Sequence, residues 1–229
     1  AAALVGLWEF YRLSRLAGAR PPRIPGLLAL AALLVIVALG GAPLPSLVLV
    51  GAIIFLIPVL FRKLTPSFLT DNIYTIAGIL YLGILSLALP LMELEHGLWW
   101  AFLLIATTTA TDTAAFFIGR ALGRHRLAPT ISPAKTREGA AGGLIAAVIV
   151  SLVIGTLSPL GLPWWQSLLL GLLVGVFSQI GDLVESALKR SVGAKDAGHL
   201  IPGHGGFLDR LDSVVFALAV VYHFAIAVT

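Results

Sequence analysis

Long apolar runs alternate with short polar junctions along this 229-residue chain. A helix needs about 20 consecutive apolar residues to cross a bilayer, and most of the runs approach that length. They predict spans at residues 1–16 (incomplete), 25–40, 45–61, 73–91, 98–119, 139–157, 165–187 and 208–228. The pattern therefore predicts an all-α, polytopic helical membrane protein with about seven complete transmembrane helices and an incomplete N-terminal one.

Composition supports this class, because 59% of the residues are hydrophobic and only 11% are charged. Such a balance excludes an ordinary soluble globular domain. The first run begins without Met and reaches Arg12 too early for a full crossing, so we expect residues upstream of it and no cleaved signal peptide. The chain has no cysteine, which excludes disulfides, cysteine zinc sites and thiol nucleophiles. Any metal must therefore use oxygen or histidine ligands.

The basic residues predict which junctions face the cytoplasm. All fifteen lie in the first, third, fifth and seventh junctions, and the alternate junctions carry none. They are Arg12, Arg15, Arg20, Arg23, Arg62, Lys63, Arg120, Arg124, Arg126, Lys135, Arg137, Lys189, Arg190, Lys195 and Arg210. Because short basic loops stay in the cytoplasm, these four junctions are predicted to be cytoplasmic. The net charge of +4 then describes one face, which suits membrane lipid headgroups or phosphates, and no nucleic-acid-binding motif accompanies it.

Polar residues divide the chain into two parts. The spans within residues 1–95 contain almost no polar side chains, so this part is predicted to serve packing or a homodimer contact. Residues 96–229 carry acids, threonine runs and glycines, together with the cytoplasmic loops 120–138 and 188–210. The chemistry is therefore predicted to lie between residues 107 and 212.

Carboxylates placed near the basic rim are the first candidate site residues. Asp112 precedes Arg120 by eight positions, and Asp182 precedes Lys189 by seven. An ionised acid at bilayer depth is costly and usually faces a cavity, a cation or a partner. The pairs Asp182 with Glu185 and Asp209 with Asp212 are each spaced three residues apart, so each is expected on one helix face. Clustered carboxylates of this kind favour a hard cation such as Mg²⁺.

A structural interpretation of the same acids stays open. Asp209 and Asp212 suit the first turn of the last span, with Lys189 and Arg210 as ion-pair partners at the interface. Asp112 suits hydrogen bonding between helices, together with the neighbouring threonines 107–111. The remaining acids are assigned to rims and loops; they are Glu9, Asp71, Glu93 and Glu95.

Two cytoplasmic segments suit phosphate binding. Residues 202–206 read PGHGG, in which glycines let the backbone approach an anion and His204 offers a donor. Residues 131–143 lead into a glycine-rich helix start and carry Ser132, Lys135, Thr136 and Arg137. Two such segments beside carboxylates predict a nucleoside triphosphate bound with metal. No Walker-type GxxxxGK[ST] sequence is present, which excludes an ordinary P-loop ATPase.

The segment Ser186–Asp212 resembles the signature of the CDP-diacylglycerol synthase (phosphatidate cytidylyltransferase) family. The signature reads S-x-x-K-R, then K-D, then P-x-H-G-G-x-x-D-R-x-D. Its fixed positions here are Ser186, Lys189, Arg190, Lys195, Asp196, Pro202, His204, Gly205, Gly206, Asp209, Arg210 and Asp212. The resemblance extends to Asp112–Arg120, Ser132–Gly139 and Trp8–Phe10. Where the family usually has SPKKT, this chain has Ala134, which leaves Lys135 as the expected phosphate contact.

The resemblance implies an enzyme that converts CTP and phosphatidic acid to CDP-diacylglycerol and pyrophosphate, in a bacterial-type plasma membrane with its active site toward the cytoplasm. It implies Mg²⁺ held by Asp182 and Asp209, with or without a second, monovalent cation such as K⁺. The residues expected to be catalytic are Lys135, Lys189, Arg190, Asp182 and Asp209. The residues expected to bind substrate are Ser132, Thr136, Lys195, Asp196, His204, Gly205, Gly206 and Arg210. The residues expected to support them are Asp112, Glu185 and Asp212.

Two other functions stay open. A CTP-dependent kinase of a lipid alcohol would use the same charged groups but would release CDP. A cation-coupled transporter would use Asp112 and Asp182 to carry ions, although no inverted repeat of interrupted helices is apparent.

Overall fold

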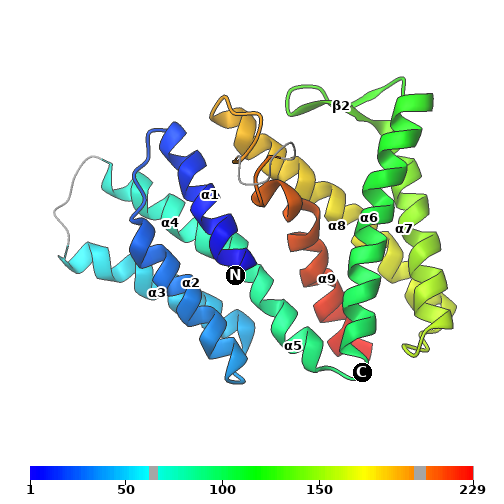
Figure 1. Ribbon diagram of the computed structural model, residues 1–229, viewed down its shortest axis with the longest axis horizontal. Coiled ribbons are helices and arrows are strands. Elements are labelled where there is room, and N and C mark those ends of the chain that lie inside the picture. The colour runs from blue at the N-terminus through cyan, green and yellow to red at the C-terminus, as the bar shows by residue number, and fades with distance from the viewer. Residues whose placement is uncertain (62–66, 199–204, 229) are drawn as a thin grey trace. The chain divides into compact units, whose positions relative to one another are not determined.

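Helices dominate the computed structural model, which describes residues 1–61, 67–198 and 205–228 (Figure 1). The helical elements are α1 (Ala2–Leu16), α2 (Arg23–Ala38), α3 (Pro43–Phe61), α4 (Phe68–Gly83), η1 (Ile84–Leu87), α5 (Ala88–Glu93), α6 (Gly97–Leu122), α7 (Arg137–Leu157), α8 (Trp164–Ser191), η2 (Leu208–Arg210) and α9 (Asp212–Val228). Each predicted span coincides with a helix or with a run of consecutive helices. The predicted all-α class is therefore confirmed apart from one short hairpin.

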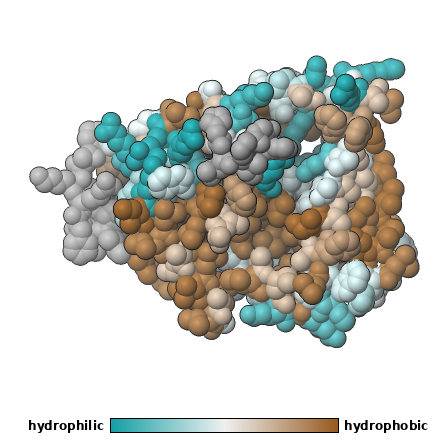
Figure 2. Space-filling view, viewed as in Figure 1, coloured by the Kyte–Doolittle hydropathy of each residue, from teal (hydrophilic) through white to brown (hydrophobic). Residues whose placement is uncertain are grey.

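Four helical segments of the described chain are long and apolar enough to cross a membrane. They are Phe68–Glu93, which joins α4, η1 and α5, and the helices α6, α7 and α8. Arg23–Ala38, Pro43–Leu56 and Asp212–Val228 are apolar but shorter. Figure 2 shows hydrophobic residues along the visible part of α7. These features confirm an integral membrane protein, while the count of seven complete spans stays a prediction.

The last predicted span begins later than expected. It was predicted from residue 208, but α9 begins at Asp212, and Asp209 lies in the separate 3-10 helix η2. The Asp209 carboxylate accepts the backbone N–H groups of Gly206 at 2.7 Å and Ala197 at 3.0 Å, which favours a closed turn over a continuing α-helix. The prediction that Asp209 and Asp212 share one face of a single helix was therefore wrong.

A small antiparallel hairpin lies between α6 and α7. Strand β1 (Arg126–Ala128) pairs with β2 (Ser132–Thr136), with Arg126 opposite Thr136 and Ala128 opposite Ser132. The hairpin is tied to the start of α7, because Arg137 N–H donates to the His125 carbonyl at 2.9 Å and Glu138 lies 2.6 Å from the His125 ring. An isolated two-stranded hairpin is marginally stable, so these ties hold it in place.

The chain forms two compact units. Unit 1 contains Ala1–Pro90 and Leu188–Leu211, and unit 2 contains Leu91–Ala187 and Asp212–Thr229. Loop 188–210, which the sequence analysis grouped with the later helices, thus packs with the N-terminal ones. The functional division of the chain at residue 95 stays a prediction.

In unit 1, helix α1 packs against α2 and α4. The Tyr11 hydroxyl donates to the Thr75 carbonyl at 3.1 Å, and a side chain at Gly78 would collide with Leu7 and Phe10. The fully buried Leu208 side chain of η2 lies near Gly6 of α1. The core of unit 1 therefore includes the C-terminal part of the signature segment as well as the N-terminal helices.

In unit 2, glycines allow the helices to approach closely. A Cβ at Gly143 of α7 would lie 2.7 Å from the Thr111 carbonyl of α6, and one at Gly171 of α8 would lie 2.7 Å from the Val148 backbone of α7. Small residues at such crossings are typical of membrane helices, which associate by close packing. The packing places the N-terminal end of α7 against α6, beside the hairpin.

Candidate active site

The predicted site residues form one cluster in each unit. The cluster in unit 1, called the Asp209 cluster, contains Asp209, Lys189 and the backbone of Ala197 and Gly206. The Lys189 ammonium donates to Asp209 Oδ1 at 2.6 Å, and both side chains are nearly buried, with exposed fractions of 13% and 11%. The other oxygen, Oδ2, accepts the two backbone N–H groups. Asp209 thus joins the end of α8 to the backbone at Ala197 and Gly206.

The burial of the Lys189–Asp209 ion pair indicates that it contributes to the stability of the fold. A nearly buried ion pair is costly to break, because removing one partner leaves a desolvated charge without its counter-ion, at about 3–5 kcal/mol. The structural interpretation expected Lys189 and Arg210 as ion-pair partners of Asp209 and Asp212, and the structure shows the Lys189–Asp209 pair. The two residues also remain the predicted metal ligand and catalytic lysine, because a phosphate or a cation can replace one member of the pair.

The cluster in unit 2, called the Asp182 cluster, contains Lys135, Asp182, Asp112 and Ser213. The Lys135 ammonium of β2 lies 2.5 Å from Asp182 Oδ2 of α8, and the two side chains are 25% and 29% exposed. The Ser213 hydroxyl of α9 donates to Asp112 Oδ2 of α6 at 3.0 Å. Asp182 and Lys135 both act electrostatically on Asp112. Three helices and the hairpin therefore bring one lysine and two carboxylates together.

The hairpin explains why Lys135 reaches this cluster. Residue 135 lies one position before the helix cap Thr136, whose hydroxyl accepts the Gly139 N–H at 3.1 Å. A Cβ at Gly119 of α6 would lie 2.9 Å from that hydroxyl, so the cap is packed against α6. The cap thereby fixes the direction in which β2 runs into α7. The predicted substrate contacts of Thr136 and of Ser132, at the start of β2, stay predictions.

Removing the Thr136 hydroxyl should destabilise the protein. A Thr136→Ala variant is expected to lose about 1 kcal/mol of the free energy of unfolding, since an N-cap hydrogen bond to α7 is lost. A Thr136→Ser variant keeps the hydroxyl and should lose much less. Far-UV circular dichroism during denaturant unfolding in detergent measures both. Equal losses in the two variants would show that the methyl group, not the hydroxyl, stabilises this position.

Several other predicted residues lie close to the cluster residues in the sequence. Arg190 donates to the Ala194 carbonyl at 3.4 Å, and Arg210, at the end of η2, is exposed. Glu185 is fully buried in α8, three residues after Asp182, and Asp212 accepts from Ser213 at the start of α9. Gly205 has a φ of +79°, a conformation that glycine adopts without strain. His204 lies outside the described residues.

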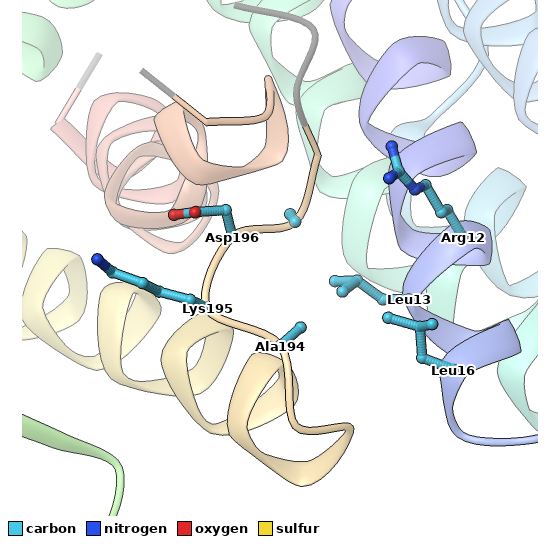
Figure 3. Close-up of a pocket in the computed structure, with 7 residues that line it drawn as sticks. Arg12, Leu13, Leu16, Ala194, Lys195 and Asp196 are labelled. Carbon is cyan, nitrogen blue, oxygen red and sulfur yellow. The ribbon is translucent and has the colours of Figure 1, made fainter. Parts of the chain in front are cut away.

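Lys195 and Asp196 border a cavity in unit 1. The cavity has a volume of about 270 Å³ and is lined on the α1 side by Arg12, Leu13 and Leu16. Figure 3 shows that the Lys195 and Asp196 side chains point away from Leu13 and Leu16. Both are exposed, so they remain available to a ligand from solvent.

The donor set suits Mg²⁺, because carboxylate oxygens are its usual protein ligands. Within the described residues, no three His, Asp or Glu side chains form a group that could hold a metal ion. The residues that would hold it are Asp182 and Asp209, each of which pairs with a lysine here. They belong to different units, so their sharing of one metal site, with or without K⁺, stays a prediction.

Sequence reasoning misassigned Glu9, did not predict the burial of Asp71, and missed the Ser213 hydroxyl. Glu9 and Asp71 were assigned to rims and loops, but Glu9 lies in the middle of α1 and is 1% exposed, whereas Asp71 lies in the first turn of α4 and is 5% exposed. Glu9 accepts the Leu208 N–H at 2.7 Å, and Asp71 accepts the Arg20 N–H at 2.6 Å. A hydrogen bond to a distant backbone group leaves no mark in local sequence. The motif Trp8–Phe10 was the available sequence signal for Glu9. The available signal for the Ser213 hydroxyl was its position directly after Asp212 in the sequence.

Comparisons with known proteins agree with the sequence signature. A family described as the cytidylyltransferase family matches residues 1–228. The phosphatidate cytidylyltransferase of Bacillus subtilis (strain 168) is 44% identical over 128 residues, which cover 56% of this chain and 48% of that protein. Those of Brucella suis biovar 1 and Staphylococcus saprophyticus are 47% and 43% identical over 152 and 150 residues. These two alignments cover 65% of this chain and 55% and 56% of the relatives. The chain thus spans about half the length of the curated relatives it matches.

Proposed function

Because the chain belongs to the cytidylyltransferase family, we propose that it acts in an enzyme that transfers the cytidylyl group of CTP to phosphatidic acid. The products are CDP-diacylglycerol and pyrophosphate. The observation that carries this proposal is the family match over residues 1–228. Several similar proteins have the name phosphatidate cytidylyltransferase. The two lysine–aspartate pairs support it, since they place cations next to carboxylates, as a phosphate-transfer site requires.

In the proposed reaction, an oxygen of the lipid phosphate attacks the α-phosphorus of CTP. A new bond forms between that oxygen and the α-phosphorus, and the bond from the α-phosphorus to the bridging oxygen of the β-phosphate breaks. Pyrophosphate leaves with the bonding electrons. The lipid phosphate already carries negative charge near neutral pH, so no dedicated base is required. The protein's task is to position the two substrates and to stabilise negative charge.

Five cations are the candidates for stabilising that charge. They are Lys135, Lys189, Arg190, Lys195 and Arg210. Lys135 and Lys189 are held by Asp182 and Asp209, so they are oriented before substrate binds and lose little side-chain freedom when it does. Mg²⁺, when bound, would neutralise charge on the triphosphate. Ser132, Thr136, Asp196 and the glycines Gly205 and Gly206 are proposed to contact substrate, and Asp112, Glu185 and Asp212 to support the site.

The site is proposed to face the cytoplasm. The support comes from the fifteen lysine and arginine residues, which all lie in alternate junctions of the chain. CTP is water-soluble, whereas phosphatidic acid keeps its acyl chains in the leaflet, so a site near this rim is accessible to both. A homodimer contact through the N-terminal helices stays a prediction.

A product assay tests the proposed function. The full-length protein, purified in detergent, is supplied with phosphatidic acid, Mg²⁺ and CTP that carries a radioactive phosphorus at the α position. Label is expected to enter the lipid, because the α-phosphate is transferred with the cytidine. In a matched reaction with CTP labelled at the γ position, the label should leave as pyrophosphate. Label that enters the lipid only from the γ position would show phosphoryl transfer to phosphatidic acid in place of cytidylyl transfer, and lipid that stays unlabelled in both reactions would refute nucleotide transfer.

A further inference from the structure

Glu9 is an acid that the proposed reaction does not use. It lies in the middle of α1 and is 1% exposed. Its Oε2 atom accepts the backbone N–H of Leu208 at 2.7 Å, which joins residues 199 positions apart in the sequence. The residue that follows Leu208 is Asp209, the centre of the Asp209 cluster. A carboxylate from the N-terminal helix thus contacts the segment that carries a proposed catalytic residue.

Two glycines of the signature segment surround the Glu9 carboxylate. A Cβ at Gly206 would lie 2.7 Å from both of its oxygens, and a Cβ at Gly198 would collide with Oε1. Both glycines lie in the described parts of the segment, on either side of residues 199–204. The backbone therefore approaches the carboxylate closely at Gly198 and at Gly206, which only residues without a side chain allow.

Burial of this carboxylate is costly, since a desolvated charge must be compensated by hydrogen bonds. Among the described residues, Oε1 has no hydrogen-bond partner, so the bond from Leu208 is the main compensation that this part of the chain supplies. An apolar side chain would fill the same space without that cost. The carboxylate must then have a role beyond packing.

We propose that Glu9 is a positioning residue for Asp209 and Lys189. Two carboxylates fix the backbone of residues 206–209. Glu9 accepts the N–H of Leu208, and Asp209 accepts the N–H groups of Gly206 and Ala197. The Glu9 bond fixes the backbone directly before Asp209, and Asp209 in turn orients Lys189. The effect on catalysis rests on the proposed function, whereas the effect on the segment does not.

A graded series at residue 9 tests the proposal in the full-length protein. Glu9→Gln keeps the length and an acceptor oxygen, Glu9→Asp keeps the charge but is one methylene shorter, and Glu9→Ala removes both. The turnover number is expected to fall about 10- to 100-fold in Glu9→Ala, as for loss of a hydrogen bond to a charged group. It should fall nearly as far in Glu9→Asp and only a few-fold in Glu9→Gln.

Asp71→Asn is the matched control. Asp71 is also a buried acid of unit 1 that accepts a distant backbone N–H, at 2.6 Å from Arg20, but the hydrogen bonds that its carboxylate forms with Arg20 and Ser67 lie outside the signature segment. This variant should lose stability while the folded protein keeps its turnover number, its KM for CTP and its Mg²⁺ requirement. In the Glu9→Ala and Glu9→Asp variants, we expect the Mg²⁺ concentration for half-maximal activity to rise, because Asp209 is displaced.

Hydrogen exchange gives a readout that needs no activity. Amides in a peptide that covers residues 205–211 should exchange faster in Glu9→Ala than in the wild type, and at the wild-type rate in Asp71→Asn. Unchanged exchange in the Glu9 variants, or equal effects in Asp71→Asn, would overturn the proposal. If the wild type transfers no cytidylyl group, the proposed function fails and the exchange data alone decide whether Glu9 positions the segment.

Discussion

An Asp209→Asn variant is expected to lose cytidylyl transfer by about two orders of magnitude or more. The amide leaves the Lys189 ammonium without its carboxylate at a position where only 13% of the lysine side chain is exposed. The asparagine can keep an oxygen at the position that accepts the Ala197 and Gly206 N–H groups only if its NH₂ group faces the Lys189 ammonium, and the opposite orientation places that NH₂ group against both backbone donors. In either orientation the variant loses the ion pair and the charge of the proposed metal ligand.

Label transfer from α-labelled CTP measures this loss, and thermal unfolding in detergent measures the accompanying destabilisation. Glu95→Gln is the control, because the Glu95 side chain is 84% exposed and its contact with His96 lies at the surface. It should behave as the wild type. A charge swap, Lys189→Asp with Asp209→Lys, restores an ion pair but not the carboxylate at the backbone donors, so it should stay inactive. Activity in the swapped protein would show that the pair serves the fold alone.

A Lys135→Ala variant is expected to lose activity by about 10- to 100-fold. Lys135 is the lysine that the hairpin brings to Asp182, at 2.5 Å, and it neutralises the carboxylate at the centre of the Asp182 cluster. Without it, Asp182 and Asp112 would lie near each other with less compensating charge. Lys135→Arg keeps the charge on a longer, planar group and should retain part of the activity.

Ala134→Ser is the matched control on the same strand. Residue 134 is exposed and directly precedes Lys135, so its substitution should leave both the KM for CTP and the turnover number unchanged. Steady-state kinetics with α-labelled CTP separate these quantities. If neither Lys135→Ala nor Ala134→Ser changes the KM for CTP or the turnover number, then Lys135 serves only as the counter-ion of Asp182. Its proposed contact with phosphate would then be wrong.

The apolar runs predicted the helices of unit 2 well, because a bilayer demands long apolar stretches and the helices follow them. The run predicted at 98–119 became α6 (Gly97–Leu122), and that at 139–157 became α7 (Arg137–Leu157). Polar extensions at the helix ends, such as the last turn of α8, lie outside such runs and were not predicted. The hairpin was missed because its strands are short and lack a repeating apolar pattern.

The site was predictable residue by residue but not contact by contact. Charge and spacing predicted that Lys189 and Asp209 matter, and the structural interpretation named Lys189 among the ion-pair partners of Asp209 and Asp212. No local pattern could show that Lys135 pairs with Asp182, because their contact depends on the direction in which β2 runs into the Thr136 cap of α7. The burial of Glu9 was beyond prediction for the same reason, since its partner Leu208 is 199 residues away.

Unit 1 is discontinuous in sequence, and this has a consequence for biogenesis. Residues 1–90 emerge from the ribosome long before residues 188–211, and residues 91–187 are made in between. During that interval Glu9 has no Leu208 to bind, and the face of α1 that covers η2 stays open. Membrane insertion of the early helices must therefore precede completion of their own core. A ribosome-bound chain that stops before residue 188 should contain inserted helices whose α1 is still accessible to a chaperone or a protease.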